Sequence, residues 1–127
     1  MTAEEKYRLA MKHIYGDGVE EDNDRAFRLL AEAAEQGHVE ASYNLGICWH
    51  YGYGTAADLE KACAWYRFAA ERGHARGQTL MARFYLEGLA VPRDPEEARR
   101  WLDMALRSED EEALAYARVL AEKLEQA

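Results

Sequence analysis

The chain has 127 residues, of which 49% are hydrophobic and 11% aromatic, so it can form one domain with a continuous core and is too apolar to be disordered. Its formal net charge of −8 argues against nucleic acid or an anionic membrane surface as partner, because both bind basic surfaces. No apolar run is long enough to predict membrane insertion. The start, MTAEEKYRLA, does not resemble a signal peptide, which predicts a cytoplasmic protein, or a secreted or periplasmic one if a leader was removed.

The first predicted unit is a pair of helices. Thr2 and Glu5 have the spacing of a capping box, so a helix should begin there and end near Tyr15. Glycines follow, which permit the left-handed conformations of a tight reversal. Asp22 should cap a second helix, and Gly37 should end it.

The same signals return at a step of 36 residues. A period between about 20 and 50 residues is typical of a solenoid of stacked helical or strand units. We therefore predict three repeats, at about 3–38, 39–74 and 75–110, within a single domain over residues 1–127. The recurring positions are Gly37-His38 and Gly73-His74; Asp22, Asp58 and Asp94; and Ala26, Ala62 and Ala98.

Small residues recur where the helices of a pair should meet. One position is alanine in all three copies, which predicts a close approach of the two helices. A second position holds Ala10, Gly46 and Ala82, so it should limit side-chain size without requiring a positive φ.

The third copy departs from the pattern. Ala90 replaces the glycine of the other two copies, which predicts a differently shaped turn. Asp94 and the proline after it again predict the start of a helix. Ser108 and Glu111 then form a second capping-box pattern, so a last helix at about 109–125 should close the end of the stack.

The clearest copy covers residues 41–74 and reads ASYNLGICWHYGYGTAADLEKACAWYRFAAERGH. It resembles the Sel1-like repeat, a relative of the tetratricopeptide repeat, and the resemblance covers nearly the whole chain. What the resemblance implies is an all-α solenoid of three antiparallel helix pairs plus the capping helix, wound as a right-handed superhelix. It also implies an adaptor for other proteins, without a conserved catalytic apparatus.

Cysteine and histidine side chains are the candidates for chemistry in this sequence. Cys48 and Cys63 lie in the two helices of one repeat, so a bridge between them is conceivable, but two buried thiols are the favoured interpretation. The histidines at 13, 38, 50 and 74 are interpreted as structural. We predict no metal, no cofactor and no enzyme activity, since no motif of nucleophilic, metal or phosphate chemistry is present.

The predicted binding surface is a stripe on the first helix of each pair, which the resemblance implies lines a concave groove. The alternative for the larger apolar members, Tyr51, Leu80 and Phe84, is packing in the core or between repeats. The stripe consists of Arg8, Lys12 and Tyr15 in copy one; Asn44, Cys48 and Tyr51 in copy two; and Leu80, Phe84 and Glu87 in copy three.

The favoured function is a monomeric adaptor or scaffold that binds a peptide or a protein in this groove. Within that class, a dedicated inhibitor or immunity protein that masks one bacterial toxin or effector is possible. The alternatives are an enzyme or a binder of small ligands, as cysteine-rich relatives have been linked to β-lactams, and a purely structural repeat module.

Overall fold

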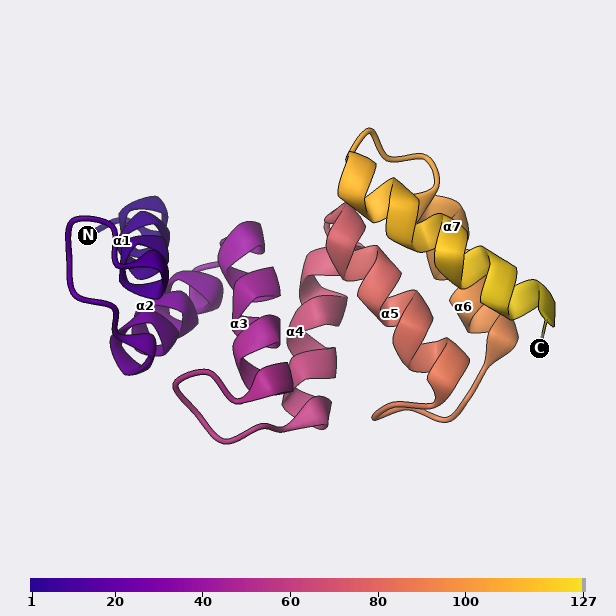
Figure 1. Ribbon diagram of the computed structural model, residues 1–127, viewed down its shortest axis with the longest axis horizontal. Coiled ribbons are helices and arrows are strands. Elements are labelled where there is room, and N and C mark those ends of the chain that lie inside the picture. The colour runs from indigo at the N-terminus through magenta and orange to yellow at the C-terminus, as the bar shows by residue number, and fades with distance from the viewer. Residues whose placement is uncertain (127) are drawn as a thin grey trace. The chain divides into compact units, whose positions relative to one another are not determined.

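The computed structural model describes residues 1–126, which form seven α-helices and no strand within that span (Figure 1). The predicted all-α class and the three helix pairs are confirmed. The helices are α1 (Ala3–Tyr15), α2 (Asn23–Glu35), α3 (Val39–Tyr51), α4 (Leu59–Glu71), α5 (Ala75–Glu87), α6 (Pro95–Ala105) and α7 (Glu111–Gln126).

The chain divides into two compact units, Met1–Phe68 and Ala69–Ala127, and the division falls inside α4. The first unit contains α1, α2, α3 and most of α4. The second contains the end of α4 with α5, α6 and α7.

The beginnings of the helices follow the predicted caps. Thr2 and Glu5 form the complete capping box of α1, with the Thr2 Oγ1 accepting from the Glu5 amide at 3.1 Å. Asp22 accepts from the Arg25 amide at 3.0 Å and caps α2. Asp94 caps α6 in the same way, directly before Pro95.

Two histidines are also N-caps. The Nδ1 atom of His38 accepts from the Ala41 amide at 3.0 Å, and Nδ1 of His74 accepts from the Gly77 amide at 3.1 Å. His38 is fixed further by stacking on Tyr7, with ring centroids 4.8 Å apart. The structural interpretation of this repeated histidine is therefore confirmed, with helix capping as its physical reason.

The loops within the three pairs close with the same main-chain hydrogen bond. The amides of Asp22, Asp58 and Asp94 donate to carbonyls near the end of the preceding helix, at 3.0, 2.7 and 2.8 Å. Ala90 adopts φ 60°, close to the 74° and 73° of the glycines at its position in the other copies. The prediction of a differently shaped turn is therefore wrong: the third loop keeps the left-handed residue and places it on an alanine, at a cost in strain.

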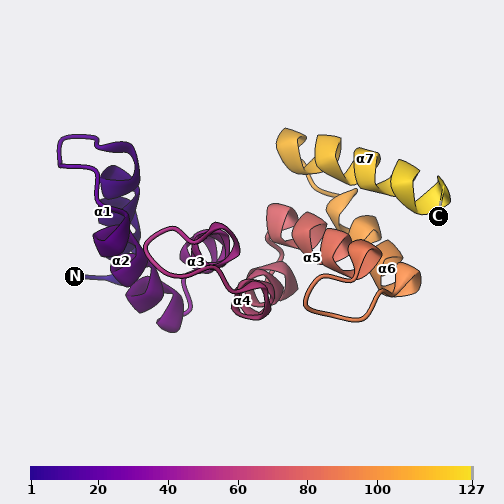
Figure 2. The ribbon, with the colours of Figure 1, turned by 60° about the horizontal axis from the view of Figure 1, so that its bottom comes forward.

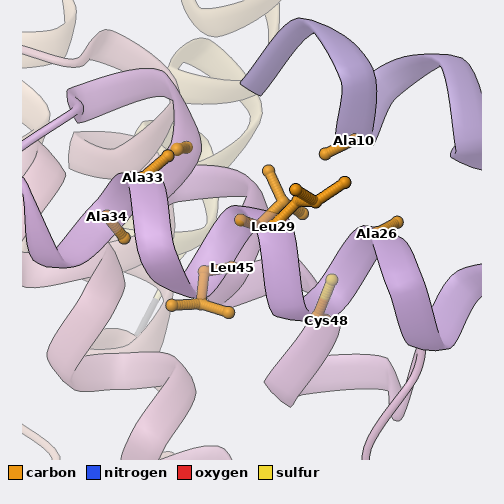
Figure 3. Close-up of a cluster of buried hydrophobic side chains, with 9 residues drawn as sticks. Ala10, Ala26, Leu29, Ala33, Ala34, Leu45 and Cys48 are labelled. Carbon is orange, nitrogen blue, oxygen red and sulfur yellow. The ribbon is translucent and has the colours of Figure 1, made fainter. Parts of the chain in front are cut away.

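The core of the first unit lies between α1, α2 and α3, where alanines let the helices approach closely. Figure 3 shows side chains from the three helices converging on this core. The alanine predicted to sit at the helix contacts is buried in all copies, and Gly46 lacks a positive φ, as predicted. The labelled core residues are Ala10, Ala26, Leu29, Ala33, Ala34, Leu45 and Cys48.

In the second unit α5 packs on α6, and α7 lies along both, as Figure 2 shows. The buried residues of α7 are Ala113, Ala117 and Leu120. Its beginning was misplaced. Asp110 caps the helix by accepting from the Ala113 amide at 3.0 Å, while Ser108 accepts only from the Asp110 amide.

Candidate binding groove

A cavity of about 220 Å³ opens in the first unit where α1, α2 and α3 meet. We call it the groove cavity. Its lining residues are Met11, Ile14 and Tyr15 from α1; Asn23 and Ala26 from α2; Asn44, Ile47 and Cys48 from α3; and Tyr53 from the following loop.

The lining of the groove cavity changes from apolar inside to amphipathic at the rim. Ala26 and Cys48 are almost fully buried. Tyr15 and Tyr53 are 74% and 48% exposed, so large parts of both rings are available to a ligand. Such a gradient suits a ligand with an apolar stem and a polar end.

Two asparagines supply the polar groups of the lining. The Nδ2 atom of Asn44 donates to the Glu40 carbonyl at 2.9 Å, so its Oδ1 atom is left as a hydrogen-bond acceptor. Asn23 is exposed at the start of α2. The cavity lining contains no charged side chain.

An aromatic row of His50, Tyr51 and Tyr53 leads from the core to the rim. The His50 and Tyr51 rings stack with centroids 4.2 Å apart, and Tyr51 stacks on Tyr53 at 5.8 Å. Below the row, His50 Nδ1 lies 3.0 Å from the buried Tyr66 hydroxyl. The exposed tyrosines are thus anchored to a core residue, which limits the entropy that they would lose on binding a ligand.

The sulfur atoms of Cys48 and Cys63 are free thiols, and both side chains are buried, which confirms the favoured interpretation. Burial raises the pKa of Cys48 to about 11 and also raises the pKa of Cys63. The Cys48 thiol at the bottom of the groove cavity is therefore protonated at neutral pH and is a poor nucleophile.

Histidine 13 also has a packing role. Its side chain is buried, with Nδ1 lying 3.0 Å from the Glu20 carbonyl and Nε2 accepting from Arg25 Nε at 3.2 Å. Both ring nitrogens are used within the fold. Over residues 1–126 no three His, Cys, Asp or Glu side chains are grouped closely enough to hold a metal.

Several residues of the predicted stripe lie at or beside the groove cavity. Tyr15 and Asn44 line it, and Tyr51 is exposed and supports Tyr53. Arg8 and Lys12 are exposed on α1, in a neighbouring hollow that shares Met11 and Tyr15 with the cavity. Arg8 Nε contacts Glu4 at 3.0 Å.

Two members of the stripe are not surface residues: Phe84 follows the alternative of packing in the core, and Cys48 is a buried thiol. Cys48 is 4% exposed and packs with the core of the first unit. Phe84 is fully buried in the second unit. Of the other members in that unit, Leu80 is half-buried, and Glu87 is exposed and paired with Arg83 at 2.9 Å.

Sequence reasoning missed the apolar walls and one rim residue. Met11 and Ile47 are the same repeat position, one residue before the chosen Lys12 and Cys48, so a stripe rotated by about 100° would have included them. Ile14 is one turn further along α1. Tyr53 lies in a loop, where helical periodicity gives no signal, and only its aromatic character between two glycines could have drawn attention to it.

The fold occurs in solved structures of Sel1 repeat proteins. The chain is 31% identical to a Sel1 repeat protein from Oxalobacter formigenes, with a TM-score of 0.83 and coverage of 87% of this chain and 46% of that one. It is 25% identical to c5321, a protective antigen of uropathogenic Escherichia coli strains, with a TM-score of 0.82 and coverage of 98% and 30%. The chain thus spans less than half the length of either protein.

A third solved structure, the Helicobacter pylori cysteine-rich protein B, is 20% identical, with a TM-score of 0.73 and coverage of 89% of this chain and 87% of that one. This likeness concerns the fold alone. A search of curated proteins found no match. No helix in residues 1–126 combines the length and apolarity that a membrane span needs.

The Sel1 repeat family model matches residues 6–38, 39–74 and 75–110, close to the repeats predicted from the 36-residue step. The matched segments cover most of the chain and include both helices of each pair. Proteins built from this repeat generally serve as protein-interaction modules. The chain therefore belongs to the Sel1 repeat family.

Proposed function

We propose that this chain is a protein-interaction adaptor and that it binds a peptide or an exposed loop of its partner at the groove cavity. The observation that supports this most directly is the cavity itself. It is apolar inside, has tyrosines and asparagines at its rim, and lies on the helices that the repeat pattern selected. This composition is typical of surfaces that bind protein chains.

The size of the cavity favours a side chain over a larger ligand. Its volume of about 220 Å³ is below the roughly 300–1,000 Å³ of most small-molecule sites, whereas one long side chain fits it. A peptide would then lie across α1 and α3 with one residue inserted. The Asn44 Oδ1 atom is placed to accept a hydrogen bond from the peptide.

Binding also agrees better than nucleophilic catalysis with the chemistry of the cavity. Its nucleophile is the Cys48 thiol, and burial holds that thiol in the protonated form. Exposed tyrosines supported by stacking provide contact area at low entropic cost.

The proposal is tested by selecting peptides from a displayed random library against the full chain and measuring their affinities by fluorescence anisotropy. Tyr15→Ala and Tyr53→Ala should each weaken binding by about tenfold, the loss expected for an interface anchor. Tyr15 is 74% exposed and Tyr53 is 48% exposed, so circular dichroism should show at most a small decrease in the melting temperature.

The matched control is Val119→Ala, which truncates an exposed side chain on α7. It should leave the affinity unchanged. Peptides that bind Tyr15→Ala and Tyr53→Ala as tightly as the unchanged protein would show that the groove cavity is not the binding site.

A further inference from the structure

The charges around the groove cavity bear on the kind of residue that enters it. The segment from His13 to Asp24 contains five carboxylates and neither lysine nor arginine. Within this segment, the loop between the two helices begins after Tyr15, the last residue of α1, and ends before Asn23, the first residue of α2. Both of these residues line the cavity. The carboxylates of this loop therefore lie near the rim, and they are exposed.

Basic side chains near the cavity do not cancel this acidity. Arg8 is paired with Glu4, and Lys12 and Arg25, which flank the segment, carry two positive charges against its five carboxylates. Lys12 is exposed in the neighbouring hollow, where Asp17 lies as well. The net charge of the chain is −8, so both the carboxylates near the cavity and the protein as a whole attract a cation electrostatically.

The rim offers the two groups that bind a cationic side chain. Tyr15 and Tyr53 expose aromatic surface, and the face of an aromatic ring attracts a guanidinium or ammonium group. The Asn44 Oδ1 atom can accept from such a group, while the Asn44 amide nitrogen is already bonded to Glu40.

The interior of the cavity fits the remainder of the same side chain. Met11, Ile14 and Ile47 form apolar walls, against which the methylene stem of arginine or lysine can pack. The charged end then stays at the rim, so its full desolvation is avoided.

We infer that the groove cavity binds an arginine or lysine side chain from a basic segment of the partner protein, with the stem between α1 and α3 and the charge between Tyr15 and Tyr53. The inference rests on the proposed function and names the chemistry of the partner. The aromatic row sets the position of Tyr53, which makes it part of the specificity of the site.

The test uses the library peptides selected on the full chain. The expected result is enrichment of arginine or lysine at one position. Replacing that arginine by the neutral isostere citrulline, or that lysine by norleucine, should weaken binding by about tenfold, as loss of a cation–π contact and of the charge attraction requires. Raising the salt concentration should weaken binding of the basic peptide more than that of the neutral one.

Variants of the protein separate the contribution of the ring from that of the charge. Tyr53→Phe keeps an aromatic face and should retain affinity within about twofold, whereas in Tyr53→Ala the preference for arginine over citrulline should shrink to about twofold. The double variant Glu20→Gln and Glu21→Gln should reduce the affinity and its salt dependence together.

The experiment distinguishes failure of the cationic assignment from failure of the groove proposal. If selected peptides lose affinity in Tyr15→Ala and Tyr53→Ala but bind equally well with citrulline or norleucine, an apolar residue fills the cavity and the cationic assignment is overturned. If the affinity is the same in both groove variants as in the unchanged protein, or if no peptide is selected, the groove proposal is wrong. The cationic assignment is then wrong as well.

Discussion

The first and second repeats use the same backbone for different cores. At three equivalent positions the first repeat has Ala10, Ile14 and Leu30, and the second has Gly46, His50 and Tyr66. The third repeat follows the first in character, with Ala82, Leu86 and Leu102. In the second repeat, a histidine and a tyrosine that interact with each other therefore replace apolar residues.

The structure shows that these residue differences between the repeats depend on one another. A Cβ atom added to Gly46 would lie 2.6 and 2.7 Å from two carbons of the Tyr66 ring, so the larger ring requires the glycine. The Tyr66 hydroxyl in turn reaches His50, and His50 stacks on Tyr51. A change in the core of one repeat is thus connected to its surface, and compensation between neighbouring residues accounts for it.

The loops differ between the same two repeats. Gly18 and Gly54 have φ values of 74° and 73°, but a Cβ atom at Gly18 would meet no heavy atom within 4 Å, while one at Gly54 would lie 2.3 Å from the Asn23 carbonyl oxygen. We expect Gly54→Ala to reduce the free energy of unfolding by about 3 kcal/mol and Gly18→Ala to reduce it by about 1 kcal/mol. Both substitutions place an alanine in the left-handed conformation, which is strained. Only Gly54→Ala also brings the new Cβ atom into collision with a neighbour. Urea unfolding followed by circular dichroism measures both. Equal losses would mean that the loop of the second repeat shifts easily and that its contact with α2 does not restrict it.

A second substitution tests the core directly. Gly46→Ala should destabilise the protein by about 1–2 kcal/mol, because the clash with the Tyr66 ring exceeds the helix propensity gained by alanine. Adding Tyr66→Leu recreates the alanine and leucine pair of the first repeat, so the double variant should be more stable than Gly46→Ala alone. A double-mutant cycle in urea measures this coupling. Additive losses would contradict the compensation between the two positions.

The smallest effect is expected from removing one oxygen atom. Tyr66→Phe keeps the ring over Gly46 and deletes the hydroxyl beside His50, so it should cost about 1 kcal/mol, the typical value of one hydrogen bond. Thermal and urea unfolding give the change in stability. The matched Leu30→Ile in the first repeat controls for a mild change at the same position. An unaltered stability would show that the hydroxyl contributes nothing to the second core.

Most of the fold was predictable because local signals repeat. Asp22, Asp58 and Asp94 cap helices by the same chemistry, and the glycines after the helices mark the reversals. The failures were also local. Ser108 and Asp110 both have cap-forming side chains near one helix start, and only the folded geometry decides between them. Ala90 shows that a recurring loop geometry can prevail over the preference of a single residue.

The site was predictable only in part, because a helical stripe does not reveal which side of it is covered. Lys12, Cys48 and Phe84 occupy one repeat position, yet the first is exposed and the others are buried. Within the first unit, α3 packs on α2 and so places Cys48 against the core. The rim residue Tyr53 depends on a loop, whose position follows from packing and not from periodicity.

The hydrogen bond that closes each loop is formed by main-chain atoms alone, and the residues whose carbonyls accept it are His13, Trp49 and Tyr85. Their side chains are three different aromatic rings. Because a main-chain hydrogen bond closes the turn, the side chain at the accepting residue can change after duplication while the turn is kept. The copies of an ancestral repeat can thus use different aromatic rings at this position while keeping one connection, because the turn does not depend on which ring is present.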